Sequence, residues 1–222
     1  MIFGKIEYLN LLPFHVFMKR YIQSSQQSHT LQYKAGVPAE INKAFKARRI
    51  DAAFISSIAS RKCKCLDLGI LARKEVRSVL LLPGKVQDDN ESATSNVLAK
   101  VLNLEGQVLI GDKALKHYLQ NDDKAIDLAE LWYERQKLPF VFARLCYHSD
   151  SKRYKKLSKA FLRSSQKIPQ YILQKASART QIDQKDILEY LTLIEYRLDP
   201  HAKLSLKRFL RLASTLKTSS FL

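Results

Sequence analysis

Small polar pairs follow short apolar strands at three places in this chain. These pairs are Ser56 and Ser57, Thr94 and Ser95, and Gly111 and Asp112, in the segments Ile50–Ile58, Glu91–Leu98 and Gln107–Leu115. We expect each pair to open a helix, whose N-terminus exposes unpaired backbone N–H groups and the positive end of its dipole. Several such N-termini around one cleft predict a site for the carboxylate of a small organic anion.

The order of the expected elements predicts how these pairs come together. A strand from Ile2 to Leu9 ends at Asn10, and apolar residues at helical spacing follow from Phe14 to Ile22. A second strand, a helix opened by Pro38 and a strand over Ala52–Ile55 complete a βαβα order. Such an order indicates a parallel sheet with its ligand outside the carboxyl ends of the strands.

The remaining expected elements form a smaller unit and a helical end. The apolar residues of the segment Leu68–Leu82, which contains Ser78, predict a buried strand. The polar segment Lys85–Asn90 is predicted to be a linker. A strand at Val108–Ile110, a helix at Lys113–Gln120 and a strand at Phe140–Tyr147 make the second α/β unit. After Ser149 apolar stripes predict three helices. The first runs from Tyr154 to Ile172, with a kink or a break at Pro169. The second runs from an Asp186 cap through Ile194 to Leu198, and the third lies around Phe209 and Leu216.

Composition bounds the class of protein. The chain has 222 residues, 46% of them hydrophobic, and a formal net charge of +17. Residues 151–222 hold 16 Lys and Arg against 5 Asp and Glu, which we interpret as solvated helix faces, because no nucleic-acid-binding motif accompanies them. No signal peptide or membrane span is indicated, so we expect a cytoplasmic protein. The three cysteines form no zinc pattern, and we expect them to be reduced and structural.

Six segments in a shared order resemble the menaquinone-biosynthesis chorismate dehydratases of the futalosine pathway. They are GKIEYLNLLPF at Gly4–Phe14, GVPAEINKAF with RRIDAAFISSIA within Gly36–Ala59, VRSVLLL at Val76–Leu82, ESATSNVL, VLIGDKAL, and DLAELWYERQKLPFVFA at Asp127–Ala143. A weaker match lies at EYLTLIEYRL, Glu189–Leu198. The interval from Ser95 to Gly111 is short for the family, which indicates a trimmed small lobe. A Cys-Pro-Asn-Asp-like opening, typical of the related dihydroxynaphthoate synthases, is absent.

The resemblance implies an α/β fold with two lobes, like the type II periplasmic binding proteins, and a helical C-terminal section. We expect residues 1–82 and 148–222 to form the larger lobe and residues 83–147 the smaller, with chorismate clamped between them. The resemblance implies loss of water from chorismate to give 3-[(1-carboxyvinyl)oxy]benzoate, with no cofactor. From the residues themselves we expect no metal, no nucleic-acid partner and no membrane.

The resemblance also assigns roles to residues. Asn10 and Ser78 are the expected catalytic residues, acting on the substrate and its leaving hydroxyl. The expected substrate-binding residues are Ser56, Ser57, Thr94, Ser95, Gly111 and Asp112. Each has a plainer interpretation: an Asx turn at Asn10, a buried hydroxyl bonded to backbone at Ser78, and helix caps for the hydroxyl pairs. Asp112 ranks lowest, because a carboxylate repels an anionic substrate.

The expected site residues include no obvious strong base, so the substrate's own carboxylate is the expected proton acceptor. His15 is the first candidate if a side chain fills that role, although a helix-face position is the commoner interpretation. Two other classes of function stay open: a non-catalytic binding protein for an aromatic acid, and a basic protein that binds nucleic acid through its C-terminal helices.

Overall fold

A six-stranded mixed sheet forms the larger part of the molecule. The computed structural model describes residues 1–23, 31–121, 124–165 and 167–219. The sheet has the order β2-β1-β3-β8-β4-β9, with β1, β2 and β3 parallel and β8 antiparallel to both of its neighbours. Its strands are β1 (Ile2–Lys5), β2 (Gln32–Ala35), β3 (Ala52–Ser56), β4 (Lys64–Ala72), β8 (Phe140–Tyr147) and β9 (Ile194–Arg197).

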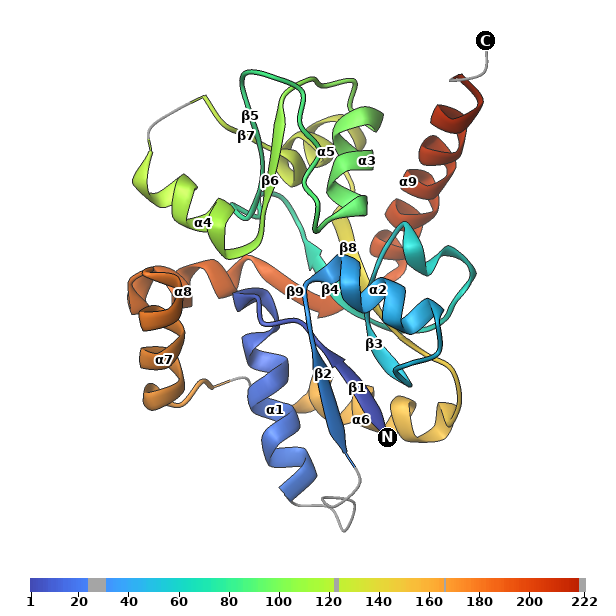
Figure 1. Cartoon of the computed structure of the whole chain (residues 1–222), viewed down its shortest axis with the longest axis vertical. Coiled ribbons are helices and arrows are strands. Elements are labelled where there is room, and N and C mark those ends of the chain that lie inside the picture. The colour runs from blue at the N-terminus through green and yellow to red at the C-terminus, as the bar shows by residue number, and fades with distance from the viewer. Residues whose placement is uncertain (24–30, 122–123, 166, 220–222) are drawn as a thin grey trace.

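A separate antiparallel sheet of three strands lies above the large sheet in Figure 1. Its order is β6-β5-β7, and its strands are β5 (Val79–Leu82), β6 (Gln107–Ile110) and β7 (Ile126–Asp127). The helices packed around it are α3 (Ala93–Val101), α4 (Gly111–Gln120) and α5 (Leu128–Gln136). The helices of the large sheet are α1 (Leu12–Gln23), α2 (Pro38–Lys46), α6 (Ser151–Arg163), α7 (Gln170–Thr180) and α8 (Gln184–Thr192).

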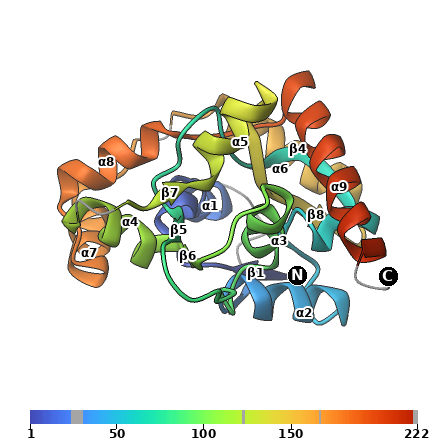
Figure 2. The same ribbon diagram turned by 90° about the horizontal axis from the view of Figure 1, so that it is seen from above.

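The last helix, α9 (Pro200–Ser219), ties the two parts together. It contacts β8 of the large sheet and α3 of the small unit, and Figures 1 and 2 both show it beside α3. Trp132 on α5 donates a hydrogen bond from Nε1 to Oγ of Ser205 at 2.9 Å, and both side chains are fully buried. No helix within the described ranges combines the length and apolarity that a bilayer crossing needs.

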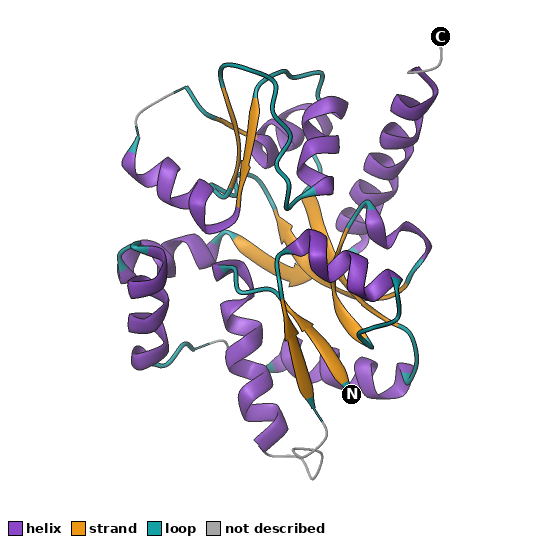
Figure 3. Cartoon of the chain, in the orientation of Figure 1, coloured by secondary structure: helices purple, strands orange, loops and turns teal. Residues whose placement is uncertain are grey.

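Strand pairing places the junctions differently from the expected boundaries at 82 and 148. The expected single strand Leu68–Leu82 is two strands, because β4 pairs in the large sheet and β5 pairs in the small one. Strand β8, expected in the smaller lobe, pairs with β3 and β4 of the large sheet. The chain therefore crosses between the sheets at residues 73–78 and again just before Phe140 (Figure 3).

The C-terminal helices also differ from their expected extents. The first stripe forms two helices, α6 and α7, so of the kink and the break expected near Pro169 the structure has the break. Pro169 stands at the N-cap of α7 and lacks the N–H that a continuing helix requires. Asp183, not Asp186, is the N-cap of α8. Residues Ile194–Arg197, expected to be helical, form β9, because pairing with β4 gives their backbone groups partners at the sheet edge.

The expectation that all three cysteines are reduced is wrong. Cys65 on β4 and Cys146 on β8 are opposite each other in the strand pairing and form a disulfide, with 81 residues of sequence separation. Cys63 is the free cysteine among the described residues. Spacing along the chain gave no signal for this bond, because it joins strands that are distant in sequence.

Candidate active site

A cavity between the two sheets gathers many of the polar residues singled out above. Its polar lining is Tyr8, Asn10, Ser56, Ser78, Ser92 and Ser95, with Gly111 beside them. Apolar side chains such as Phe54, Ile70 and Phe142 complete the wall and suit the faces of a ring. Of the described residues that line the cavity, none carries a carboxylate, imidazole, amine or guanidinium group.

Three helix N-termini meet at this cavity, as the sequence predicted in outline. Pro38 is the first residue of α2, Ser92 is the N-cap of α3, and Gly111 is the first residue of α4, and all three line the cavity. One of the three N-termini is not the expected one. Ser56 ends β3, and no α-helix of the described residues begins at Ser57, so the N-terminus of α2 at Pro38 stands in the cavity instead. The chain after Ser57 forms a short 3-10 turn, Ala59–Lys62.

Asn10 lies on a 3-10 turn, Leu9–Leu11, which residues 6–8 connect to the end of β1. Its side-chain oxygen Oδ1 is buried and accepts no hydrogen bond from the described residues. Its backbone oxygen accepts one from the hydroxyl of Tyr196 at 2.7 Å. An Asx turn would have used Oδ1 locally, so the structure leaves an unsatisfied acceptor in the cavity wall, and such acceptors are rare in folded proteins.

Ser78 is fixed from two sides. Its hydroxyl shares a hydrogen bond of 2.9 Å with the hydroxyl of Tyr190 on α8, and both side chains are buried. Its backbone oxygen accepts from the N–H of Gly111 at 2.9 Å. Burial raises the pKa of Tyr190, with hydrogen bonds to Ser78 and Asn10 opposing the rise, so the phenol is neutral and able to donate.

The crossing segment before Ser78 is held by one buried carboxylate. Asp127 accepts hydrogen bonds at Oδ2 from the N–H groups of Val76 and Arg77, at 2.7 and 2.6 Å. Its other oxygen caps α5. Arg77 has a positive φ of 57°, so the chain turns sharply here and presents the next side chain to the cavity.

The predicted site residues did not include Tyr8 and Ser92, which line the cavity. Tyr190, whose hydroxyl contacts Ser78, was also missed. It comes from the segment Glu189–Leu198, where only a weak family match was visible, and the helical stripe assigned there did not include it. A tyrosine three residues after Ile187, a residue of the apolar stripe, was the available signal, because a tyrosine on an inward helix face needs a hydrogen-bond partner.

Gly111 is required by shape as well as by backbone conformation. Its φ is +70°, and a Cβ at this position would lie 2.8 to 3.0 Å from the ring of Tyr8. The Tyr8 hydroxyl in turn donates to the Glu91 carboxylate on the small unit. The tyrosine ring therefore closes one side of the cavity against the start of α4.

Three of the predicted binding residues do not line the cavity. Ser57 donates from Oγ to the backbone oxygen of Val141 at 2.6 Å, inside the large sheet. Thr94 accepts at Oγ1 from the N–H of Ile58 at 3.2 Å, which links α3 to the large sheet. Their contacts with a ligand remain predictions.

Asp112 is the third of them, and it also bridges the two parts of the molecule. Its Oδ1 accepts from the N–H of Leu9 at 2.9 Å, and its Oδ2 lies 3.0 Å from Nη1 of Arg179 on α7. Burial raises the pKa of Asp112, while these two partners oppose the rise. Like Thr94, the side chain holds the small unit against the large one.

His15 is not placed to act as a base in the cavity. Its Nε2 lies 2.8 Å from the backbone oxygen of Ile6, which fits a neutral ring that donates there. Burial lowers its pKa to about 4. It lines a different pocket, between α1 and α7, so the interpretation of a buried helix residue holds.

The chain has the lobed fold of the periplasmic-binding-protein-like class. Protein AF1704 from Archaeoglobus fulgidus is similar over 98% of this chain and 97% of that chain, with a TM-score of 0.72 and 11% identity. The periplasmic aliphatic sulphonate binding protein SsuA from Escherichia coli covers 98% and 92%, with a TM-score of 0.56 and 10% identity. Such similarities show the fold alone, and they confirm the predicted periplasmic-binding-protein-like architecture.

Sequence similarity gives the particular family. A chorismate dehydratase from Campylobacter jejuni subsp. jejuni serotype O:23/36 (strain 81-176) is 47% identical over 220 residues, which cover 97% of this chain and 99% of that protein. A family model described as menaquinone biosynthesis matches residues 1–107 and 103–215. The chain belongs to this menaquinone biosynthesis family, which confirms the predicted resemblance.

Proposed function

We propose that this protein is a chorismate dehydratase, a lyase that removes water from chorismate to give 3-[(1-carboxyvinyl)oxy]benzoate in the futalosine route to menaquinone. The cavity carries this proposal, because hydroxyl and amide groups at three helix N-termini suit a carboxylated ring. The 47% identity to a chorismate dehydratase along nearly the whole chain supports it independently.

The chemistry needs little from the protein beyond position. Elimination breaks the C3–H and C4–O bonds of chorismate and leaves an aromatic ring, so the intrinsic driving force is large. Since no described residue of the lining carries a carboxylate, imidazole or amine that could serve as a base, the enolpyruvyl carboxylate of the substrate takes the C3 proton. The protein then holds the ring so that the proton and the hydroxyl leave together or in sequence.

Asn10 and Ser78 act on the leaving hydroxyl in this scheme. The unsatisfied Oδ1 of Asn10 accepts a hydrogen bond from the C4 hydroxyl, and the Ser78 hydroxyl donates to its oxygen as charge develops there. Gly111, Ser92 and Ser95, at the N-termini of α3 and α4, receive the carboxylates.

We further propose that the reaction needs no cofactor and takes place in the cytoplasm. The two sheets form two lobes that part at the crossings near residues 73–78 and before Phe140 to admit substrate. The links made by Thr94, Asp112 and Tyr8 then close over the bound ring.

The test is a turnover assay with purified protein, chelator-treated and supplied with fresh chorismate, with product followed by liquid chromatography and mass spectrometry. We expect the benzoate product, and we expect Asn10→Ala and Ser78→Ala to slow its formation without unfolding the protein. Absence of product from folded protein refutes the activity. Tight binding of chorismate without turnover would instead identify a binding protein of the same fold.

A further inference from the structure

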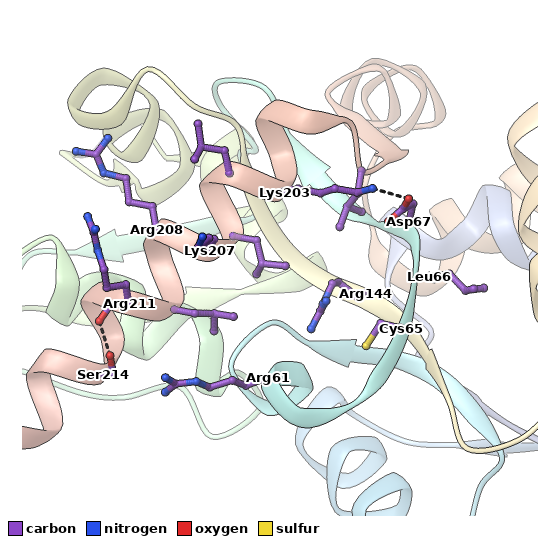
Figure 4. A pocket seen from close by; sticks show the side chains of 14 residues that line it. Arg61, Cys65, Leu66, Asp67, Arg144, Lys203, Lys207, Arg208, Arg211 and Ser214 are labelled. Atoms are coloured by element: carbon purple, nitrogen blue, oxygen red, sulfur yellow. Dashed lines mark hydrogen bonds and ion pairs between the residues drawn. The ribbon is translucent and has the colours of Figure 1, made fainter. Parts of the chain in front are cut away.

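A second pocket, lined by none of the residues of the cavity described above, lies between α9 and the large sheet and has a volume of about 960 Å³ (Figure 4). We call it the basic pocket and define it by its positively charged lining. These residues are Arg61, Arg144, Lys203, Lys207, Arg208 and Arg211. Figure 4 shows Lys207, Arg208 and Arg211 on α9, with Arg144 on the strand that α9 covers.

The charges of the basic pocket are not balanced by protein carboxylates. Asp67 is the acidic residue in the lining, and it pairs with Lys203 at 2.5 Å. The other five cations form no ion pair with any described residue. Elsewhere in the chain arginines do find such partners: Arg73, for example, binds Glu195 and Asp199 at 2.9 and 2.7 Å.

Arg144 is the least solvated of these cations. It stands on β8, where its guanidinium donates to the hydroxyl and backbone oxygens of Ser60 at 2.8 to 3.1 Å. Burial lowers its pKa, since these neutral acceptors do not compensate for the lost water. An arginine stays charged under such conditions, so a half-buried guanidinium beside further cations favours an anion from outside the chain.

Apart from Ser214, the rest of the wall is mostly apolar. Leu66, Leu198 and Leu206 are buried in it, and Leu204 contributes an exposed face. Such a wall adds affinity only for a ligand that brings hydrocarbon surface with its charge. A flat anionic surface would touch the outer lysines of α9 without reaching Arg144, because the pocket is concave.

We propose that the basic pocket binds a small organic anion with at least two negative charges on carboxylate or phosphate groups and an apolar body. The guanidinium of Arg144 receives one oxygen pair, while Lys207 and Arg211 on α9 receive the remaining charge. The site is distinct from the catalytic cavity. Ala143 lines the catalytic cavity, and Arg144 is the next residue on β8. Because successive side chains of a strand point to opposite faces, Arg144 lies on the other face of the sheet from the cavity.

Isothermal titration calorimetry of the full chain at physiological ionic strength tests this proposal. The probes are 1-naphthyl phosphate and a naphthalene dicarboxylate, whose comparison separates phosphate from carboxylate ligands. Inorganic phosphate tests the charge alone and naphthalene-methanol the ring alone. We expect at least one naphthyl anion to bind more tightly than both of these.

A pair of charge-matched variants locates the binding. We expect Lys207→Glu with Arg211→Glu to weaken binding by about tenfold or more, which corresponds to about 1.4 kcal/mol. Lys46→Glu with Lys85→Glu, an equal change in net charge outside the pocket, should leave the affinity within about twofold. Ser78→Ala should also leave it unchanged, because the cavity is a separate site.

Three results would overturn the proposal: no binding of either naphthyl anion, equal weakening by the two charge-reversed pairs, or loss of binding in Ser78→Ala. Equal affinity for inorganic phosphate and 1-naphthyl phosphate would reject the apolar part of the ligand. We expect chorismate turnover of the pocket variant to equal that of the wild type, so this test and the test of the dehydratase activity fail independently.

Discussion

Removing the hydroxyl of Tyr190 tests whether this residue positions Ser78 for catalysis. The two hydroxyls are 2.9 Å apart, and each side chain is 2% exposed, so water cannot replace the lost bond. In Tyr190→Phe the Ser78 hydroxyl loses the partner that orients it in the cavity wall. An unsatisfied buried polar group costs about 1–3 kcal/mol of folding free energy. A misplaced catalytic group slows turnover by about a hundredfold.

We therefore expect kcat to fall by about 10- to 100-fold in Tyr190→Phe, with KM changed far less, because the lost bond orients a group that acts on the leaving hydroxyl. Steady-state kinetics on chorismate and urea unfolding supply the two readouts. Tyr154→Phe is the matched control, since Tyr154 is equally buried, on α6 outside the cavity.

The double variant separates positioning from direct action. If Tyr190 acts through Ser78, then Ser78→Ala with Tyr190→Phe should be no slower than Ser78→Ala alone. If Tyr190→Phe keeps the wild-type kcat and loses stability only to the extent of Tyr154→Phe, the tyrosine is merely structural and the reasoning is refuted.

Three further predictions concern stability. Gly111→Ala should cost more than about 1 kcal/mol of unfolding free energy in urea, and more than Gly84→Ala, because both have positive φ but a Cβ has open space at Gly84. The pKa of His15 is about 4 in the folded protein and near 6.5 in the unfolded chain. Between these pH values the unfolded state binds the extra proton. The free energy of unfolding should therefore fall by up to about 3 kcal/mol as the pH drops from about 6.5 to 4. His15→Gln should lack this pH-dependent component while it keeps turnover, and an identical pH profile in both proteins would contradict it. Reduction of the Cys65–Cys146 disulfide should lower the free energy of unfolding by about 2–4 kcal/mol. Denaturation and intact-mass measurements with and without reductant check this. If the protein has the same mass before and after reduction, the bond is absent.

Local pattern carried much of the fold. The strand before Asn10, the helix opened by Pro38 and the buried strand Ala52–Ser56 are visible in the alternation and punctuation of the sequence, because these signals depend on neighbouring residues. The end of α8 is different. Ile194 continues a helical stripe, yet it starts β9, since pairing with β4 outweighs helix propensity at the sheet edge.

The sequence by itself determined which groups are available: hydroxyls, an asparagine and glycine after strand ends, no base among them, and a surplus of cations near the C-terminus. Only the tertiary structure decided which of these groups meet. It brought Tyr190 to Ser78, sent Thr94 and Asp112 to bridge the two sheets, and joined Cys65 to Cys146. These contacts span 36 to 112 residues of sequence, and no local pattern encodes them, because they depend on how strands far apart in the chain pair and pack.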